Sequence, residues 1–346
     1  MRTGRWVMWA LLLCACLCAV TAGAQTVIAG ADVSFLRQME QRGVQFKDAG
    51  VAKPGLEILK DHGYTWVRLR VMVNPISLPN DQAYTIALAK DAKARGFKLL
   101  LDFHYSDDWA DPGHQWTPRA WQKMSHAELV QATFAYTRDT IAAFRKAHVM
   151  PDMVQVGNEV TAGMMWPDGR LPGNWPQFAD LLKAGIRGVK KGSGWGHRPL
   201  IMVHIDKGGN WAATKSFLDH LEQYGVRYDV VGQSYYPWWQ GSLDGLRENL
   251  TQTWVTFHKP TMVVETAYDW RTGEDFKGKT PPFPETPEGQ REFLEALKKV
   301  AGEAPGGKLR GIFWWEPMAG GGIAKRDLFD DEHEALPAIH VFDPVR

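Results

Sequence analysis

The chain has 346 residues, of which 45% are hydrophobic and 23% charged, a balance typical of a folded globular protein and not of a disordered chain. Its 40 lysines and arginines against 39 aspartates and glutamates leave a net charge of +1, so no overall basic field is present to bind nucleic acid. The 16 tryptophans are the unusual feature, and they indicate aromatic binding surface as well as core.

We expect residues 1–24 to be a secretory signal peptide. Arg2 and Arg5 precede a short apolar run, and the segment ends in Ala22-Gly-Ala24, a small-residue cleavage pattern. Cleavage before Gln25 would export the mature protein, either into the medium or into a periplasm.

Two other interpretations of this segment stay open. A transmembrane anchor is one, although the apolar run from Trp6 to Val20 is shorter than the ~20 residues that span a bilayer. A lipoprotein signal around Cys14 and Cys16 is the other. These two cysteines and Cys18 are the only ones in the sequence, so residues 25–346 contain no thiol for disulfides, zinc–thiolate sites or a cysteine nucleophile.

Eight short apolar runs alternate with longer helix-compatible segments along residues 25–346. The predicted strands are Val27–Ala31, Trp66–Val71, Lys98–Phe103, Met153–Val156, Leu200–Val203, Val230–Gln233, Thr261–Val264 and Gly311–Phe313. The predicted helices include Gln82–Arg95, Ala127–Lys146, Phe178–Val189 and Glu288–Val300. Alternating strands and helices imply parallel strands with right-handed crossovers. Eight such units favour an α/β fold with a single (β/α)8 TIM barrel over an open sheet.

The composition between these segments indicates one catalytic domain over residues 25–346. No glycine-rich phosphate loop follows the first predicted strand, which argues against a nucleotide-binding sheet. No linker or charge block marks a second domain, and the Gly/Pro-rich stretch 271–289 is expected to be a long loop after the seventh strand.

Polar or aromatic residues lie within or directly after the end of each predicted strand. These are Asp32, Arg68, Arg70, Asp102, His104, Asn158, Glu159, His204, Asp206, Gln233, Tyr235, Glu265, Trp314, Trp315 and Glu316. In a barrel all such positions meet at the C-terminal face, where the active sites of this fold lie. A single polar strand end has an ordinary structural explanation, whereas the full series indicates a functional site.

Glu159 and Glu265 stand apart because apolar strands deliver them directly to this face. Burying two acids at rigid strand ends costs free energy, which points to a functional use. Glycoside hydrolysis needs such a pair, one acid to protonate the leaving oxygen and one to attack the sugar or activate water. The alternative is a pair of structural acids matched by arginines. Asn158 beside Glu159 suits a hydrogen bond to a sugar 2-hydroxyl.

Several motifs in chain order resemble those of the endo-β-1,4-galactanases of glycoside hydrolase family 53. The most specific is Asp102-Phe-His-Tyr-Ser-Asp107 with Trp109-Ala-Asp-Pro112. The others are Gly30-Ala-Asp-Val-Ser34, Val67-Arg-Leu-Arg-Val71, Gly157-Asn-Glu-Val160, His204-Ile-Asp206, Tyr235-Tyr-Pro237, Val263-Val-Glu-Thr266 and Trp314-Trp-Glu-Pro317. The resemblance covers nearly the whole chain after residue 25.

The resemblance implies a retaining enzyme with the acid/base after the fourth strand and the nucleophile after the seventh, which are Glu159 and Glu265 here. It implies cleavage of internal β-1,4-galactosidic bonds in type I arabinogalactan, so galactan and galacto-oligosaccharides are the expected partners. Arg68 matches an arginine of the family and is our candidate for the cation that holds Glu265. The two carboxyl groups of a retaining pair are expected about 5–5.5 Å apart.

Further residues are expected to bind substrate. Tyr235 is predicted to hydrogen-bond Glu265, and Trp315 to provide an aromatic platform for the sugar at the cleaved bond. Sugar hydroxyl groups are expected to be bound by Asp102, His104, His204 and Asp206, although either histidine could be a core residue. Other candidate platforms, each of which could instead be core, are Trp109, Trp166, Trp238, Trp239 and Trp314.

No cofactor and no catalytic metal are expected. The possible ligands His104, Asp107, Asp108, Asp111 and His114 have neither zinc nor calcium-loop spacing. The resemblance leaves room for a structural calcium between the loops after strands seven and eight, where Asp269, Asp327, Asp330 and Asp331 lie. A monomer without membrane or nucleic-acid partners is the expected state of the mature protein.

Two other functions stay open at this point. One is a barrel hydrolase of another β-1,4-glycan, such as xylan, mannan or cellulose, and the other is a barrel that binds glycan without cleaving it. The segments Lys207–Trp211 and Thr266–Trp270 depart from the pattern of the family in loops expected to line the cleft. The sequence therefore does not predict the number of sugar subsites or the product length.

Overall fold

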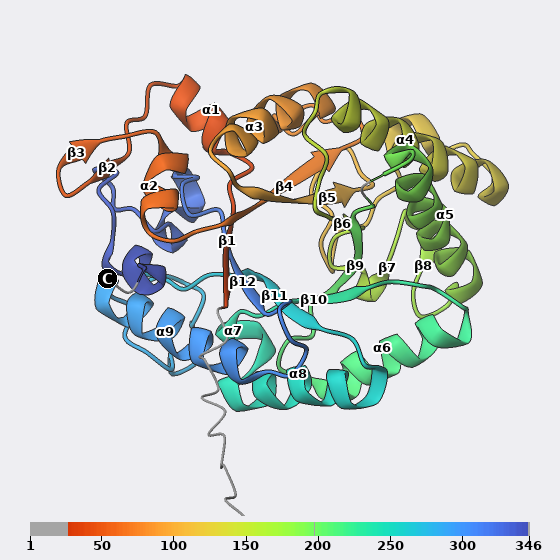
Figure 1. Ribbon diagram of the computed structural model, residues 1–346. Helices are drawn as coiled ribbons and strands as arrows, with labels where there is room; N and C mark the ends of the chain where they lie inside the picture. The colour runs from red at the N-terminus through yellow and green to blue at the C-terminus, as the bar shows by residue number, and fades with distance from the viewer. Residues whose placement is uncertain (1–26, 197, 345–346) are drawn as a thin grey trace, which may run out of the picture.

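The computed structural model describes residues 27–196 and 198–344. Eight parallel strands form a closed barrel in the order β1-β12-β11-β10-β9-β6-β5-β4, and the helices surround it (Figure 1). The barrel strands are β1 (Ile28–Asp32), β4 (Trp66–Met72), β5 (Lys98–His104), β6 (Met153–Val156), β9 (Leu200–Ile205), β10 (Val230–Ser234), β11 (Thr261–Thr266) and β12 (Gly311–Trp315). The predicted (β/α)8 barrel and its eight strands are confirmed. The predicted signal peptide lies outside the described residues.

The described helices follow the strands around the outside of the barrel. The α-helices are α1 (Leu36–Gln41), α2 (Gly55–Asp61), α3 (Gln82–Ala94), α4 (His126–Lys146), α5 (Trp175–Ser193), α6 (Trp211–Gln223), α7 (Pro237–Gln240), α8 (Leu243–Phe257) and α9 (Pro287–Glu303). Short 3₁₀ turns are η1 (Arg119–Trp121), η2 (Val160–Ala162), η3 (Gly321–Arg326) and η4 (Pro337–Phe342). Two small hairpins join β2 (Lys47–Asp48) to β3 (Val51–Ala52) and β7 (Gly163–Met164) to β8 (Gly169–Arg170).

Local sequence signals explain where several helices begin. The Asp81 side chain accepts the Tyr84 N–H at the start of α3, and Ser125 with Glu128 forms a capping box at the start of α4. At α9 the Thr286 side chain caps the helix and Pro287 occupies its first turn. The loop predicted over 271–289 therefore ends at Thr286, and the helix predicted over Glu288–Val300 begins at Pro287.

A layer of apolar side chains fills the inside of the barrel below the polar strand ends. It consists of Trp66, Leu100, Met153, Met202, Val230, Met262, Val264 and Phe313. Space in this layer is tight at β1, where a Cβ on Gly30 would lie 2.4 Å from the ring of Phe313. Because this apolar layer closes the bottom, polar groups inside the barrel are confined to the C-terminal ends of the strands.

Within the described part of the chain, no helix combines the length and the apolar character needed to cross a membrane.

Candidate active site

A cavity of about 910 Å³ opens at the C-terminal ends of the barrel strands. Arg68, Asn158, Glu159 and Glu265 contribute to its polar wall, and Trp315 to its aromatic wall. These residues come from β4, the segment after β6, β11 and β12, so the site is assembled by the closure of the barrel.

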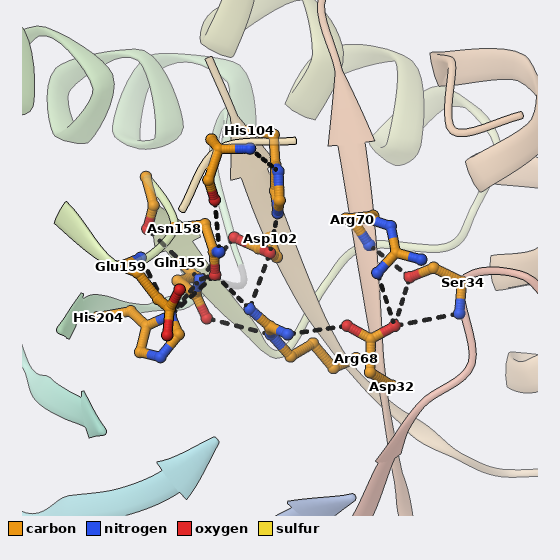
Figure 2. Close-up of polar contacts among 12 residues, drawn as sticks. Asp32, Ser34, Arg68, Arg70, Asp102, His104, Gln155, Asn158, Glu159 and His204 are labelled. Carbon is orange, nitrogen blue, oxygen red and sulfur yellow. Dashed lines mark hydrogen bonds and ion pairs between the residues drawn. The ribbon is translucent and has the colours of Figure 1, made fainter. Parts of the chain in front are cut away.

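Arg68 is the centre of the polar wall, as Figure 2 shows. Its Nη1 donates to Asp32 Oδ2 at 2.8 Å and to Glu265 Oε2 at 2.9 Å. Its Nη2 donates to Asp102 Oδ2 at 2.9 Å and to Asn158 Oδ1 at 2.6 Å. Burial alone would lower the pKa of Arg68, but the surrounding carboxylates raise it further than burial lowers it. The guanidinium is therefore a fixed positive charge beside Glu265.

Glu265 reaches the cavity because β11 carries an irregularity at this point. Gln233 of β10 pairs with Val263 and the next residue, Ser234, pairs with Glu265, so Val264 is an extra residue on β11. Val264 belongs to the apolar layer inside the barrel, and Glu265 lines the cavity. Strict alternation would turn one of these two neighbouring side chains outward, whereas the β-bulge keeps both inside.

Two donors hold the carboxylate of Glu265. Arg68 contacts one oxygen, and the Tyr236 hydroxyl donates to Oε1 at 3.1 Å. Burial raises the pKa of Glu265 above its ordinary value and the charges of Asp32 and Asp102 add to that shift, while the charge of Arg68 and the Tyr236 hydrogen bond oppose it. Arg68 and Tyr236 are therefore the two contacts that favour the ionised form of Glu265.

Glu159 has the opposite surroundings. Burial raises its pKa well above the ordinary value, and the negative charges of Glu265 and Asp206 raise it further. The Ser234 hydroxyl donates to Glu159 Oε1 at 2.6 Å, and none of the described residues forms an ion pair with this carboxylate. The backbone of Glu159 is left-handed, with φ of 44°, a conformation that non-glycine residues adopt rarely and mostly at functional sites.

His204 supports Glu159 from behind. Its Nδ1 accepts the Glu159 backbone N–H at 3.3 Å. Because the Ser234 hydroxyl donates its hydrogen to Glu159, Nε2 carries the ring proton and donates to Ser234 Oγ at 2.9 Å. Burial lowers the pKa of His204 well below its ordinary value, and the charge of Arg68 contributes in the same direction. A neutral imidazole therefore orients Ser234, which in turn contacts Glu159. Figure 2 shows His204 next to Glu159.

Asp102 and His104 form a second buried pair beside Arg68. His104 Nε2 donates to Asp102 Oδ2 at 3.0 Å, and its Nδ1 accepts the Ala110 N–H at 3.2 Å. Gln155 Nε2 donates to the other oxygen of Asp102 at 2.6 Å. His104 lines the cavity, but Asp102 does not, so Asp102 is placed to hold its neighbours and not to touch a ligand.

The predicted binding residues divide into two groups. Those at the cavity wall are Arg68, His104, Asn158, Asp206 and Trp315. Asp102 and His204 are fully buried behind this wall. They contact the residues that line the cavity, and not the cavity itself as their predicted binding of sugar hydroxyls would require.

The prediction for Tyr235 is wrong. Its hydroxyl donates to the Gly241 carbonyl at 2.9 Å, and its ring stacks on Phe293 of α9 outside the barrel. Tyr236 is the tyrosine that contacts Glu265. The two-residue alternation of β10, counted inward from Val230, would have indicated Ser234 and Tyr236, which sequence reasoning missed.

Some of the candidate platform tryptophans line the cavity and the others are buried in the core. Trp109, Trp239 and Trp315 line the cavity, and the rings of Trp109 and Trp315 lie 6.1 Å apart. Trp238 and Trp314 are core residues with 1% exposure, and Trp166 is also buried. The indole of Trp314 points to the Arg326 carbonyl instead of the cavity.

A second buried ion pair, also missed from the sequence, holds the aromatic wall. Arg70 on β4 contacts Glu316, and its guanidinium carbon lies 4.5 Å from the ring centres of both Phe35 and Trp109. Burial raises the pKa of Glu316 to about 8, against the opposing charge of Arg70. The Arg70 guanidinium therefore helps to hold the ring of Trp109 in place.

The residues of the possible calcium site do not fit that ion. Lys325 Nζ lies 3.1 Å from Asp269 Oδ2 and 2.9 Å from Asp275 Oδ2, so a protein cation already joins the loops after β11 and β12. The other candidate acids point elsewhere. Asp327 accepts the Gly320 N–H, Asp330 accepts the N–H groups of Glu332 and Glu334, and Asp331 pairs with Arg271.

A parallel eight-stranded barrel with two buried glutamates of contrasting surroundings in an aromatic-lined cavity is the architecture of a barrel glycoside hydrolase. The model of glycosyl hydrolase family 53 matches residues 28–342, and the chain belongs to that family.

Three relatives extend this result. An uncharacterized protein of Niallia circulans is 42% identical over 85% of this chain and 84% of its own length. A protein of Neosartorya fischeri named probable arabinogalactan endo-beta-1,4-galactanase A is 36% identical over 87% of this chain and 86% of its own. The solved family 53 catalytic domain of Ignisphaera aggregans superposes with a TM-score of 0.86 at 33% identity, covering 93% of this chain and 97% of that one.

Proposed function

We propose that this protein is an exported endo-β-1,4-galactanase that hydrolyses internal bonds of type I arabinogalactan by a retaining mechanism. Membership of family 53 and relatives named as galactanases support the substrate. The observation that carries the mechanism is the contrast between Glu265, which faces Arg68 and Tyr236, and Glu159, whose pKa burial and neighbouring carboxylates raise well above its ordinary value.

In the first step Glu265 attacks the anomeric carbon while Glu159 gives its proton to the leaving glycosidic oxygen. The C–O bond of the polymer breaks, and a galactosyl ester forms on Glu265. In the second step the Glu159 carboxylate takes a proton from water, whose oxygen attacks the anomeric carbon and frees Glu265. Each group returns to its starting protonation state, so no metal or cofactor is required by this chemistry.

Asn158 is suited to bind the 2-hydroxyl of the sugar at the cleaved bond. Its Oδ1 accepts from Arg68, and one Nδ2 hydrogen donates to the Ala110 carbonyl at 2.7 Å. The second Nδ2 hydrogen is then available, and the side chain lines the cavity in a fixed orientation. Such a hydrogen bond strengthens as positive charge develops on the ring. Trp315 and Trp109 are suited to pack against the C–H faces of galactose.

The test is incubation of residues 25–346 with debranched β-1,4-galactan, and in parallel with xylan, mannan and cellulose. New reducing ends and product sizes are measured. A ladder of galacto-oligosaccharides from galactan alone is the expected result, because internal cleavage yields many lengths. Products from another glycan alone would show that galactan is not the substrate. If none of the four glycans is cleaved, the protein would be a barrel that binds glycan without cleaving it.

Export and a monomeric state belong to the same proposal. The signal-peptide pattern of residues 1–24 supports export. N-terminal sequencing of the secreted protein should begin at Gln25. Retention of the whole segment would contradict the proposed cleavage.

A further inference from the structure

A cluster of two histidines and two aspartates lies on a part of the molecule that the active site does not use. Asp48 ends β2, His62 follows the last residue of α2, and His340 and Asp343 belong to the C-terminal segment around η4. Figure 1 places the blue C-terminal segment on the same side as β2 and β3. The Lys47 N–H also bonds to the His333 carbonyl, so the first and last parts of the chain meet here.

Asp343 orients both imidazoles. Its Oδ1 lies 2.6 Å from His62 Nδ1, and its Oδ2 lies 3.1 Å from His340 Nδ1. The ring centres are 4.4 Å apart at an angle of 83°. Because one carboxylate accepts from the Nδ1 of both rings, the lone pair of each neutral imidazole is on Nε2. A carboxylate bonded to the other ring nitrogen is the usual arrangement around histidines that bind metal.

His62 supplies the observation that points to a ligand. The residue is 7% exposed, and its buried Nε2 has no hydrogen-bond partner among the described residues. This nitrogen lies 3.4 Å from Asp48 Oδ2. One ligand atom each of Asp48, His62 and His340 lies within 4.8 Å of the other two. An orphaned buried nitrogen facing a carboxylate needs an explanation, and a shared cation is one.

We propose that Asp48, His62 and His340 bind one divalent transition-metal ion of the zinc class. Ligands at about 2.0–2.1 Å from a tetrahedral zinc are about 3.3 Å apart, which matches the 3.4 Å between His62 Nε2 and Asp48 Oδ2. The side chain of His340 is 50% exposed, so it has room to move toward the ion and supply the third ligand. Two imidazoles select zinc, cobalt or nickel over calcium and magnesium, which prefer oxygen ligands.

One protein cation is near this site. Lys53 Nζ lies 3.6 Å from Asp48 Oδ2 but 2.8 Å from Asp61 Oδ2, so Asp61 is its closer partner. An ion at Asp48 would leave the pair of Lys53 and Asp61 intact. Such an ion would link β2, α2 and the C-terminal segment, and would stabilise the folded state by mass action. It would have no part in the chemistry of the barrel cavity.

The test uses the mature protein without a histidine tag, freed of metal by a chelator. Equilibrium dialysis should show one zinc ion bound per chain, and added zinc should raise the melting temperature by several degrees. Cobalt in place of zinc should give visible absorption bands of a low-symmetry site. Calcium and magnesium should have no comparable effect on the melting temperature.

Variants locate the ion. His340→Gln, at a half-exposed position that tolerates change, and His62→Gln should both abolish binding. Asp343→Asn should weaken it about 10- to 100-fold, because an amide keeps only one of the two acceptor oxygens that orient the rings. His126→Gln is the matched control and should bind zinc like the parent protein. His126 also contacts two aspartates, Asp168 and Asp180, but it does not belong to the proposed site. Absence of zinc binding, or equal binding by His340→Gln and the parent protein, would overturn the proposal.

Discussion

The two glutamates of the cavity are chemically identical and equally buried, and they differ in what faces them. Glu265 receives the Arg68 guanidinium and the Tyr236 hydroxyl, whereas Glu159 receives the Ser234 hydroxyl and the field of nearby carboxylates. Environments that separate the pKa values of two acids also separate their roles. This difference supports the proposed roles, with Glu159 as the acid/base and Glu265 as the nucleophile.

Glu265→Gln removes the proposed nucleophile while keeping the shape of the side chain. We expect hydrolysis of galactan to fall at least about 1000-fold, because an amide cannot form the galactosyl ester. Binding of a galacto-oligosaccharide, measured by calorimetry, should stay within about tenfold of the parent protein. Arg68 loses a charged partner in this variant, so circular dichroism must first show that it folds. Unchanged turnover would remove Glu265 from the mechanism.

Tyr236→Phe tests the contact that replaces the predicted role of Tyr235. The Tyr236 hydrogen bond lowers the pKa of Glu265, so its loss should raise that pKa. The acid limb of kcat/KM should therefore move to higher pH, and kcat should fall about 10- to 100-fold. Tyr235→Phe is the control, because its hydroxyl bonds to Gly241 outside the cavity. Similar pH profiles for the two variants would argue against this assignment.

The positions of these residues were only partly predictable from the sequence. Glu159 and Glu265 could be found because polar residues directly follow apolar strands. The error at Tyr235 came from taking the first tyrosine after the strand, although alternation from Val230 turns it outward. Arg70, Gln155 and Ser234 were not assigned roles, because their partners lie on other strands and become visible only when the barrel closes.

At the scale of the elements, the placement of Glu265 depends on the bulge in β11. The strand sequence Thr261-Met-Val-Val-Glu265 has no glycine or proline to announce an extra residue, so the bulge could not be predicted. The order and type of the strands could be predicted, since each is a short apolar run between helix-compatible segments. Helix ends were approximate where caps such as Asn174 before α5 carry no bonding side chain.

Gly30→Ala tests how tightly β1 and β12 pack inside the barrel. A Cβ at Gly30 would lie 2.4 Å from the Phe313 ring, which is held by the apolar layer and has little room to move. We expect the free energy of unfolding to fall by about 1–3 kcal/mol, measured by urea denaturation. Gly173→Ala is the control, because nothing lies within 4 Å of a Cβ there. Equal stability of the two variants would mean that the barrel interior adjusts freely.

At the scale of the whole molecule, parallel strands and their crossovers were predictable, but contacts between the chain ends were not. The backbones of Lys47 and Glu334 form an isolated β-bridge, and η4 packs beside α9. Such contacts join segments at opposite ends of the sequence, and neither periodicity nor spacing refers to them. The contacts of Lys325 with Asp269 and Asp275, which join the loops after β11 and β12, could not be predicted from the sequence either.

Asp327 lies directly after η3, and its burial is expected to make the stability of the protein depend on pH. Burial raises its pKa to about 8, although the Gly320 and Ala319 N–H groups oppose that shift. The unfolded chain loses this proton near about pH 4. Between these values the folded state binds more protons than the unfolded state, so this group lowers the free energy of unfolding as pH rises.

Asp327→Asn should remove that contribution, because an amide stays neutral. Between pH 5 and 8 the parent protein should lose more unfolding free energy than the variant, by at most about 4 kcal/mol. Urea denaturation at both pH values measures the difference. Asp139→Asn is the control, since Asp139 is exposed and Arg138 lowers its pKa, which places its titration below this range. Parallel pH dependence in the parent protein and Asp327→Asn would mean that Asp327 is ionised in the folded state, with the loop N–H groups outweighing burial.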